Sequence, residues 1–218
     1  MVRFLYRIMW LFICPVLKIL AKYFCQLEIK NTHFLKDLHG PLIIYGNHIS
    51  PFSPPILAIS IPWRHAIMPI RFLTAEDIYS LYKGLLGIFL AMVGCVPVNR
   101  NKAIDSLKKT LKSAKNILND SEVIGIFPEG KSSFNKELLP FQAGAAYLTC
   151  QFPNVPILPV TIYWQPQNFS IKEFFEKKTK VIVLFGEAFR LKSSNRKSIT
   201  GELEKKLKDL LNYFDENL

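Results

Sequence analysis

Residues 42–60 read LIIYGNHISPFSPPILAIS and set out a strand, a loop and a helix in that order. The strand is expected over the short apolar run Leu42–Tyr45, which ends at a glycine. A helix is expected next, because Pro54 and Pro55 precede a further apolar run and proline is tolerated in a first helical turn. Ser53 is a good N-cap for that helix. The loop between the two elements carries His48.

The same alternation of strands and helices continues along the chain. Further apolar runs typical of buried strands occupy residues 94–98, 123–127, 155–164 and 181–185. Helical patterns occupy residues 103–118, 144–151 and 199–214. This order predicts an α/β fold, with a mostly parallel central sheet flanked by helices. Pro156 and Pro159 within one strand run favour an edge strand or a bulge there.

Composition narrows the class of protein. With 218 residues, of which 50% are hydrophobic and 21% charged, the chain is long enough for one good core and is not disordered. Its 28 Lys and Arg residues against 17 Asp and Glu give a net charge of +11, which indicates an anionic partner. Because the mean hydropathy is also positive, at +0.17, a membrane surface is favoured over nucleic acid. We expect no nucleic-acid partner, since no RNA- or DNA-binding motif accompanies the charge.

The N-terminal stretch has the character of a membrane-surface helix. Residues 3–25 are mostly apolar, basic residues interrupt them, and their aromatic residues are types that favour the membrane interface. One helix, or two helices kinked near Pro15, is expected. A signal peptide, a single tilted span and an ordinary core helix are the alternatives. The simplest division is a membrane-associated helical segment over residues 1–30 and an α/β domain over residues 31–218.

Two polar loops that follow apolar strands carry side chains suited to chemistry. In the first, His48 at the end of a strand is well placed to meet a substrate. In the second, Glu129, Gly130, Lys131 and two serines fall together, and lysine, hydroxyl and backbone N–H groups suit a phosphate. Arg100 follows a third strand run. Each loop taken alone is also consistent with an ordinary structural turn.

Taken together, these segments resemble the glycerolipid acyltransferase family, of the 1-acylglycerol-3-phosphate acyltransferase type. The blocks that carry the resemblance are NHISPFSPP at 47–55, GCVPVNR at 94–100, FPEGKSS at 127–133 and VPILPV at 155–160. In the family they read NHxSxxDPP, a strand ending in Arg, FPEGTRS and VPIxPV. The blocks occur here in the family's order, and the resemblance implies a membrane-apposed N-terminal helical element as well.

The resemblance also implies an activity. A fatty acyl group would pass from a thioester, acyl-CoA or acyl carrier protein, to a hydroxyl of a lysophospholipid such as 1-acylglycerol-3-phosphate. His48 would be the general base that takes the proton of that hydroxyl, an effect worth about 10²–10⁴-fold in rate. No metal and no cofactor beyond the thioester co-substrate is expected, and anionic lipid at the cytoplasmic face of a membrane is the expected partner. The substrate-binding residues implied are Asn47, Arg100, Glu129, Gly130, Lys131 and Ser132.

Two positions depart from the family pattern. The motif's Asp, five residues after the histidine, is Ser53 here, so the catalytic pair would be His48 with Ser53. A hydroxyl supplies no charge to an imidazolium, and neutralising the corresponding Asp in Ser-His-Asp hydrolases costs about 10⁴ in turnover. In the FPEG block the Arg position holds Ser132, while Lys131 offers a point charge one residue earlier.

These departures leave three alternatives open. The chain is a slow acyltransferase, or it is a catalytically impaired, acyltransferase-like lipid-binding protein. In the third alternative another carboxylate assists the histidine, and the candidates are Asp37, Glu76 and Asp77.

Overall fold

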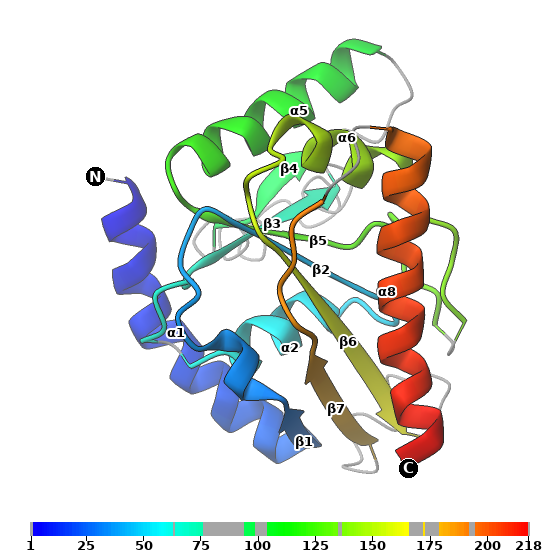
Figure 1. The fold of residues 1–218 in the computed structure, drawn as a ribbon. Helices are drawn as coiled ribbons and strands as arrows, with labels where there is room; N and C mark the ends of the chain where they lie inside the picture. The colour runs from blue at the N-terminus through cyan, green and yellow to red at the C-terminus, as the bar shows by residue number, and fades with distance from the viewer. Residues whose placement is uncertain are drawn as a thin grey trace.

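The computed structural model describes residues 2–62, 64–75, 94–98, 104–134, 137–165, 172, 179–191 and 195–217. Within these ranges the chain forms a seven-stranded sheet in the order β1-β7-β6-β2-β5-β3-β4 (Figure 1). All neighbouring strands are parallel except β6 and β7, which are antiparallel. The strands are β1 (Cys25–Lys30), β2 (Leu42–Gly46), β3 (Ile70–Ala75), β4 (Val96–Val98), β5 (Val123–Ile126), β6 (Ile157–Gln165) and β7 (Thr179–Phe185). The predicted α/β fold with a mostly parallel sheet is confirmed.

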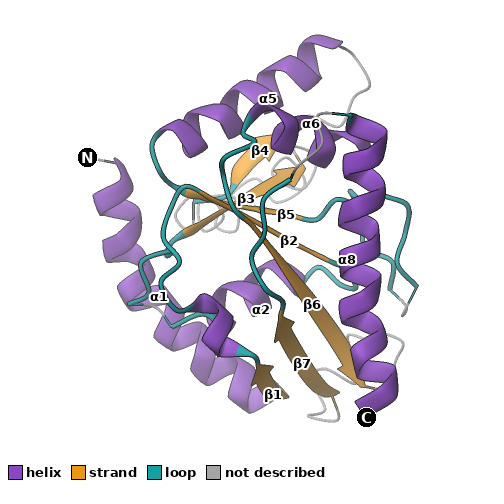
Figure 2. Cartoon of the chain, in the orientation of Figure 1, coloured by secondary structure: helices purple, strands orange, loops and turns teal. Residues whose placement is uncertain are grey.

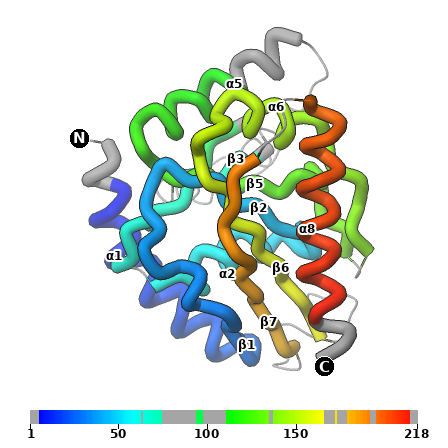
Figure 3. Tube along the Cα trace, in the orientation of Figure 1, coloured from blue at the N-terminus to red at the C-terminus, as the bar shows by residue number. Residues whose placement is uncertain are grey.

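Helices cover both faces of the sheet. One face carries α1 (Val2–Phe24) and α2 (Ser53–Ser60), while the other carries α5 (Ile104–Asn119), α6 (Ala143–Gln151) and α8 (Arg196–Asn217) (Figures 1 and 2). Figure 3 shows α1 and α8 on opposite sides of the molecule. A short 3₁₀ helix (Thr32–Leu35) links β1 toward β2. Every helix expected from the sequence is present.

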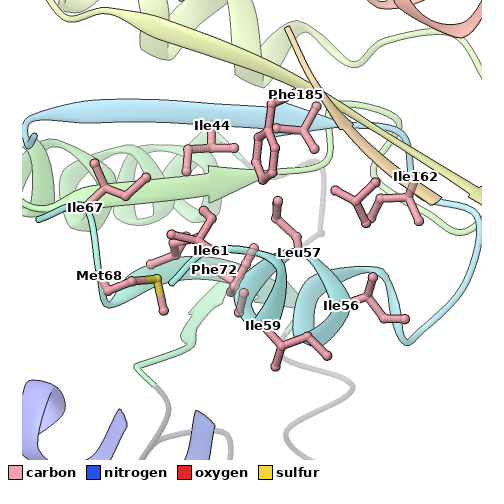
Figure 4. Close-up of a cluster of buried hydrophobic side chains, with 14 of the residues drawn as sticks. Ile44, Ile56, Leu57, Ile59, Ile61, Ile67, Met68, Phe72, Ile162 and Phe185 are labelled. Atoms are coloured by element: carbon pink, nitrogen blue, oxygen red, sulfur yellow. The ribbon is translucent and has the colours of Figure 1, made fainter. Parts of the chain in front are cut away.

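Alternate residues of strand β2 contribute to two hydrophobic cores, one on each face of the sheet. Successive side chains of a strand point to opposite faces. Leu42 and Ile44 accordingly belong to the core under α1 and α2, whereas Ile43 and Tyr45 belong to the core under α5, α6 and α8. All four are fully buried, and burial of side chains this size contributes about 1.5–3 kcal/mol each. Figure 4 shows the first core, with Leu57 of α2 pointing toward the sheet.

Two strands were not expected from the sequence. The first, β1, reads CQLEIK and lies at the edge of the sheet, where its polar residues reach solvent. Its strict apolar–polar alternation is the signal that identifies such a half-buried strand. The second, β3, reads IRFLTA, and its arginine interrupts the apolar run that would have indicated a strand.

An edge strand at Pro156 and Pro159 is wrong, whereas a bulge, the other expectation, agrees with a one-residue shift in pairing beside Pro159. Strand β6 lies between β7 and β2, and its register with β2 continues through Pro159 without a slip. The carbonyl of Pro159 faces the β7 side, where it accepts the N–H of Gly186 at 2.9 Å. The missing N–H of the proline faces the same side, just beyond the β6–β7 ladder that begins at Val160. The ladder stops at this proline and pairing resumes one residue out of register, because Val160 pairs with Phe185 whereas Ile157 pairs with Phe189.

Helix α1 is a single helix that includes Pro15. One side of it packs against α2 and the sheet through Trp10 and Cys14, both buried. The opposite side leaves Phe12 and Ile19 exposed, at 72% and 68% of their surface. Among the described residues, none of the helices combines the length and the apolar character needed to cross a membrane. Residues 25–30 of the expected N-terminal segment form β1, which pairs with β7.

Candidate active site

The two polar loops singled out in the sequence meet at the carboxyl ends of β2 and β5. These strands are parallel neighbours, so the loops that follow them emerge at the same edge of the sheet. The N–H of Ser133 donates to the carbonyl of His48 at 2.8 Å, and the N–H of Phe134 donates to the carbonyl of Ile49 at 3.0 Å. The histidine loop and the FPEG loop are thus paired through their backbones.

The carboxylate of Glu129 stabilises this pairing by accepting backbone hydrogen bonds. Its carboxylate accepts the N–H of His48 at 2.6 Å on one oxygen and the N–H of Leu139 at 2.8 Å on the other. The side chain is only 2% exposed. Burial raises the pKa of Glu129 above its ordinary value of 4.5, while the two N–H groups act in the opposite direction. The observed contacts of Glu129 are therefore with backbone, and they fix where His48 sits.

The imidazole of His48 is held by an aromatic neighbour and turned toward the FPEG loop. Its ring stacks on Phe127 with centroids 4.6 Å apart and planes at 28°. Phe127 in turn stacks on Phe72 of β3 at 6.1 Å. Nδ1 of His48 is buried, and Nε2 lies 3.4 Å from Oγ of the half-buried Ser132. No role was expected for Phe127 from the sequence, although its place directly after a strand is the pattern that could have indicated one.

Asn47 extends the sheet where β2 leaves it. The ladder between β2 and β6 ends at the Gly46–Val160 pair. Beyond it, the Asn47 amide donates to the carbonyl of Ile162 at 2.9 Å, and the N–H of Ile162 donates to Oδ1 of Asn47 at 2.7 Å. The side chain is buried at 3% exposure. It thus replaces a backbone strand residue and anchors the loop immediately before His48.

Ser53 closes the turn that leads into α2. Its Oγ accepts the N–H of Ser50 at 3.1 Å, while its own N–H donates to the carbonyl of Ser50 at 2.9 Å. The expected N-cap role is wrong, because Phe52 occupies the cap position and Ser53 is the first helical residue, with its hydroxyl directed back to the preceding turn. Both serines are fully buried. The hydroxyl therefore stabilises the loop that carries His48.

The remaining predicted residues are distributed as follows. Gly130 adopts a φ of +73°, in the left-handed region that favours glycine, and turns the FPEG loop outward. Lys131 beside it is exposed. Arg100 lies outside the described residues, as do two of the candidate substitute carboxylates, Glu76 and Asp77. The third, Asp37, is exposed and precedes the start of β2, so it lies toward the opposite edge of the sheet from His48.

An ion pair at that opposite edge was missed. Arg71 of β3 donates from Nη1 to Glu122 at 2.9 Å and from Nε to the carbonyl of Gly94 at 2.7 Å. The two charged side chains are 13% and 10% exposed. Sequence alone offers no signal for a pair 51 residues apart. Because both residues lie at the amino ends of their strands, the pair stabilises the sheet away from the histidine.

The described donor groups of the site do not form a metal centre. Within the part of the chain that the structure describes, no three His, Cys, Asp or Glu side chains lie together as a metal ion would require. The groups that do converge are one imidazole, hydroxyls and a buried carboxylate bound to backbone N–H groups. This arrangement suits proton transfer to or from an oxygen nucleophile.

In a comparison with known proteins, the chain is similar to acyltransferases of one kind. It is 28% identical over 165 residues to human 1-acyl-sn-glycerol-3-phosphate acyltransferase beta, covering 74% of this chain and 56% of that protein. It is 34% identical over 124 residues to the 1-acyl-sn-glycerol-3-phosphate acyltransferase of Saccharomyces cerevisiae, covering 56% of this chain and 38% of that protein. The chain thus spans about half the length, or less, of these curated relatives.

A solved structure shares the fold. It is the 1-acyl-sn-glycerophosphate (LPA) acyltransferase PlsC from Thermotoga maritima, with a TM-score of 0.64 and 16% identity, over 91% of this chain and 79% of that one. The family model described as Acyltransferase matches residues 26–163, which include both loops of the site. The chain therefore belongs to the acyltransferase family, and the relatives it matches are of the 1-acylglycerol-3-phosphate acyltransferase type.

Proposed function

We propose that this protein transfers a fatty acyl group from a thioester donor to a hydroxyl of a lysophospholipid such as 1-acylglycerol-3-phosphate. The observation that carries the proposal is the placement of His48, in a chain of the acyltransferase family. Its backbone is fixed by Glu129, its ring rests on Phe127, and its Nε2 is directed to the loop where a substrate would approach. The donor is acyl-CoA or acyl carrier protein.

The proposed reaction needs one base. Nε2 of His48 takes the proton of the acceptor hydroxyl, whose oxygen attacks the thioester carbonyl. The tetrahedral intermediate then expels the thiolate, which receives the proton from the imidazolium. Asn47 and Glu129 act as positioning residues, because their polar atoms are engaged by backbone.

The acceptor's phosphate is assigned to the outer part of the FPEG loop. Lys131 is exposed there, in the turn made by Gly130, and can approach an anion from solvent. Arg100 is retained as a second phosphate ligand on the strength of the family resemblance. A lysine binds phosphate as a point charge and not as a bidentate fork, so the affinity for the acceptor should depend strongly on salt.

Ser53 supports a second candidate function, a lipid-binding protein that no longer turns over. The Ser53 hydroxyl already accepts the N–H of Ser50 and carries no charge to stabilise an imidazolium. Binding of lysolipid without acyl transfer is what this alternative predicts.

An acyl-transfer assay with lysophosphatidate in anionic vesicles and acyl-CoA, or acyl carrier protein, separates the two candidates. Wild type should transfer slowly, His48→Ala should lose ~10²–10⁴-fold, and Ser53→Asp should raise the rate. His39→Ala is the matched control, because His39 is exposed and lies before β2, away from the site. Transfer by His48→Ala at the wild-type rate, or lysolipid binding with no transfer by wild type or Ser53→Asp, would refute the enzymatic proposal.

We also propose that α1 lies on the cytoplasmic face of a membrane containing anionic lipid. The exposed side of this helix carries large apolar residues, of which Phe12 and Ile19 are the most exposed. Lys22 on the same helix is exposed as well. An amphipathic helix of this kind inserts its apolar side among lipid headgroups, and each nearby basic residue adds about 1 kcal/mol on an anionic leaflet.

A further inference from the structure

We infer that Ser132 is itself a nucleophile, so that the site can hold the acyl group covalently as an ester of Ser132. This inference rests on the proposed function in one respect only, that an acyl thioester reaches the site. It adds a different first step, in which a side chain of the protein attacks the thioester instead of the acceptor lipid. It also implies a further activity, slow hydrolysis of the thioester when no acceptor is present.

The geometry that carries the inference is a hydroxyl next to a base. Oγ of Ser132 lies 3.4 Å from Nε2 of His48. A nucleophile and its base are expected within about 2.6–3.2 Å in the reacting complex, and the distance is often longer without substrate. With the ring proton on the buried Nδ1, Nε2 is the acceptor and the Ser132 hydroxyl is the donor.

The surroundings hold both partners in this relation. The peptide of His48 is fixed on its N–H side by Glu129 at 2.6 Å and on its carbonyl side by the N–H of Ser133 at 2.8 Å. The stacking of the imidazole on Phe127 favours the observed orientation of the ring. Ser132 sits between these fixed points, and its half-buried side chain leaves the hydroxyl within reach of a substrate.

Serine at position 132, in place of the family's arginine, changes the chemistry available at that position. The family resemblance puts arginine at position 132, where it would offer a cation but no nucleophile. Serine at the same position removes that cation and places an oxygen beside the base. Because a hydroxyl group is activated by an adjacent imidazole, one substitution changes the position from phosphate ligand to candidate nucleophile.

The step balances without any further reactant. Oγ of Ser132 forms a bond to the thioester carbonyl carbon as its proton passes to Nε2 of His48. The C–S bond breaks, and the departing thiolate takes that proton and leaves as a thiol. In the second half, water or the acceptor hydroxyl attacks the acyl-serine, its proton passes to Nε2, and Oγ of Ser132 recovers the proton as its bond to carbon breaks.

The test is to incubate the purified full chain with palmitoyl-CoA in the absence of acceptor, quench in acid and map the acylated peptide by mass spectrometry. Wild type should carry one palmitoyl group on Ser132, formed together with a burst of free CoA. Ser132→Ala should lose both, and His48→Ala should slow acylation ~10²–10⁴-fold. Ser132→Cys should regain the adduct as a thioester that neutral hydroxylamine cleaves. Ser133→Ala, the neighbouring hydroxyl, should still carry the adduct on Ser132.

The outcomes separate this inference from the proposed function. If wild type acylates lysophosphatidate but forms no adduct, and Ser132→Ala acylates it equally well, transfer is direct and the inference is overturned while the function stands. If the adduct forms and hydrolyses but never passes to lysophosphatidate, the inference stands and the function fails. An adduct that maps to Ser133 overturns the inference, and the absence of both adduct and transfer refutes both proposals. Circular dichroism of Ser132→Ala checks that its loss is not a loss of fold.

Discussion

The contact between Asn47 and Ile162 should be sensitive to a single substitution. Asn47→Ala removes both hydrogen bonds, at 2.9 and 2.7 Å, and leaves the N–H and the carbonyl of Ile162 without partners. Ile162 is fully buried in the centre of the sheet. Each buried backbone group left unsatisfied costs about 1–3 kcal/mol, so we expect a loss of about 4 kcal/mol in the free energy of unfolding. For a chain of this length, that corresponds to a fall in Tm of roughly 8–16 °C.

Urea denaturation followed by circular dichroism measures this loss. Asn116→Ala is the matched control, because Asn116 is an exposed asparagine on α5, and a change there should stay within about 0.5 kcal/mol. Asn47→Asp keeps an acceptor for the N–H of Ile162 but sets a second oxygen against its carbonyl, so it should also destabilise the protein. If Asn47→Ala unfolds within about 0.5 kcal/mol of wild type, the side chain does not complete the ladder and the account of this loop is incorrect.

Three further predictions concern other parts of the molecule. Burial raises the pKa of Glu129 above 4.5, so the folded state binds a proton more readily than the unfolded chain. The stability that this group contributes is complete below pH 4.5 and is lost as the pH rises through the folded pKa. The unfolding free energy of wild type should therefore rise relative to that of Glu129→Gln as the pH falls from 7 toward 4.5. A difference between the two proteins that does not change with pH would contradict this expectation. Arg71→Met and Glu122→Gln should each cost about 3 kcal/mol, and a double-mutant cycle should give a coupling above about 0.5 kcal/mol, whereas simple additivity would show that the pair is not coupled. Phe12→Asp should weaken sedimentation with anionic vesicles and leave Tm unchanged; equal sedimentation would exclude the exposed side of α1 as the contact.

The sequence predicted those strands and helices in which one physical signal dominates. The central strands are buried on both faces and read as continuous apolar runs, as in Leu42–Tyr45, so their prediction succeeded. Strands β1 and β3 carry polar residues among apolar ones, so they lack a continuous apolar run, and they were not predicted. Pro159 indicated the irregular pairing on the β7 side but not that β6 is an interior strand, because a sequence does not show which neighbour the missing N–H would have faced.

The sequence indicated several residues of the site but not the role that each of them plays. That His48 and Glu129 come together follows from the parallel order of β2 and β5, which the sequence pattern predicts in kind. Residue type alone does not show which groups face a substrate and which groups hold backbone. A buried asparagine such as Asn47 and an exposed lysine such as Lys131 look equally suited to bind a ligand until burial and partners are known.

This division also explains how the fold accommodates its two departures from the family motifs. Asn47 and Glu129 hold the loops in place through hydrogen bonds that do not involve the side chain at position 53 or 132. Ser53 still supplies an oxygen to the N–H of Ser50, so the start of α2 is preserved when the carboxylate is absent. Charge at the site has therefore changed without disturbing the backbone that presents His48. It follows that Ser53→Asp and Ser132→Arg alter chemistry more than stability, and the two positions can be tested independently of the scaffold.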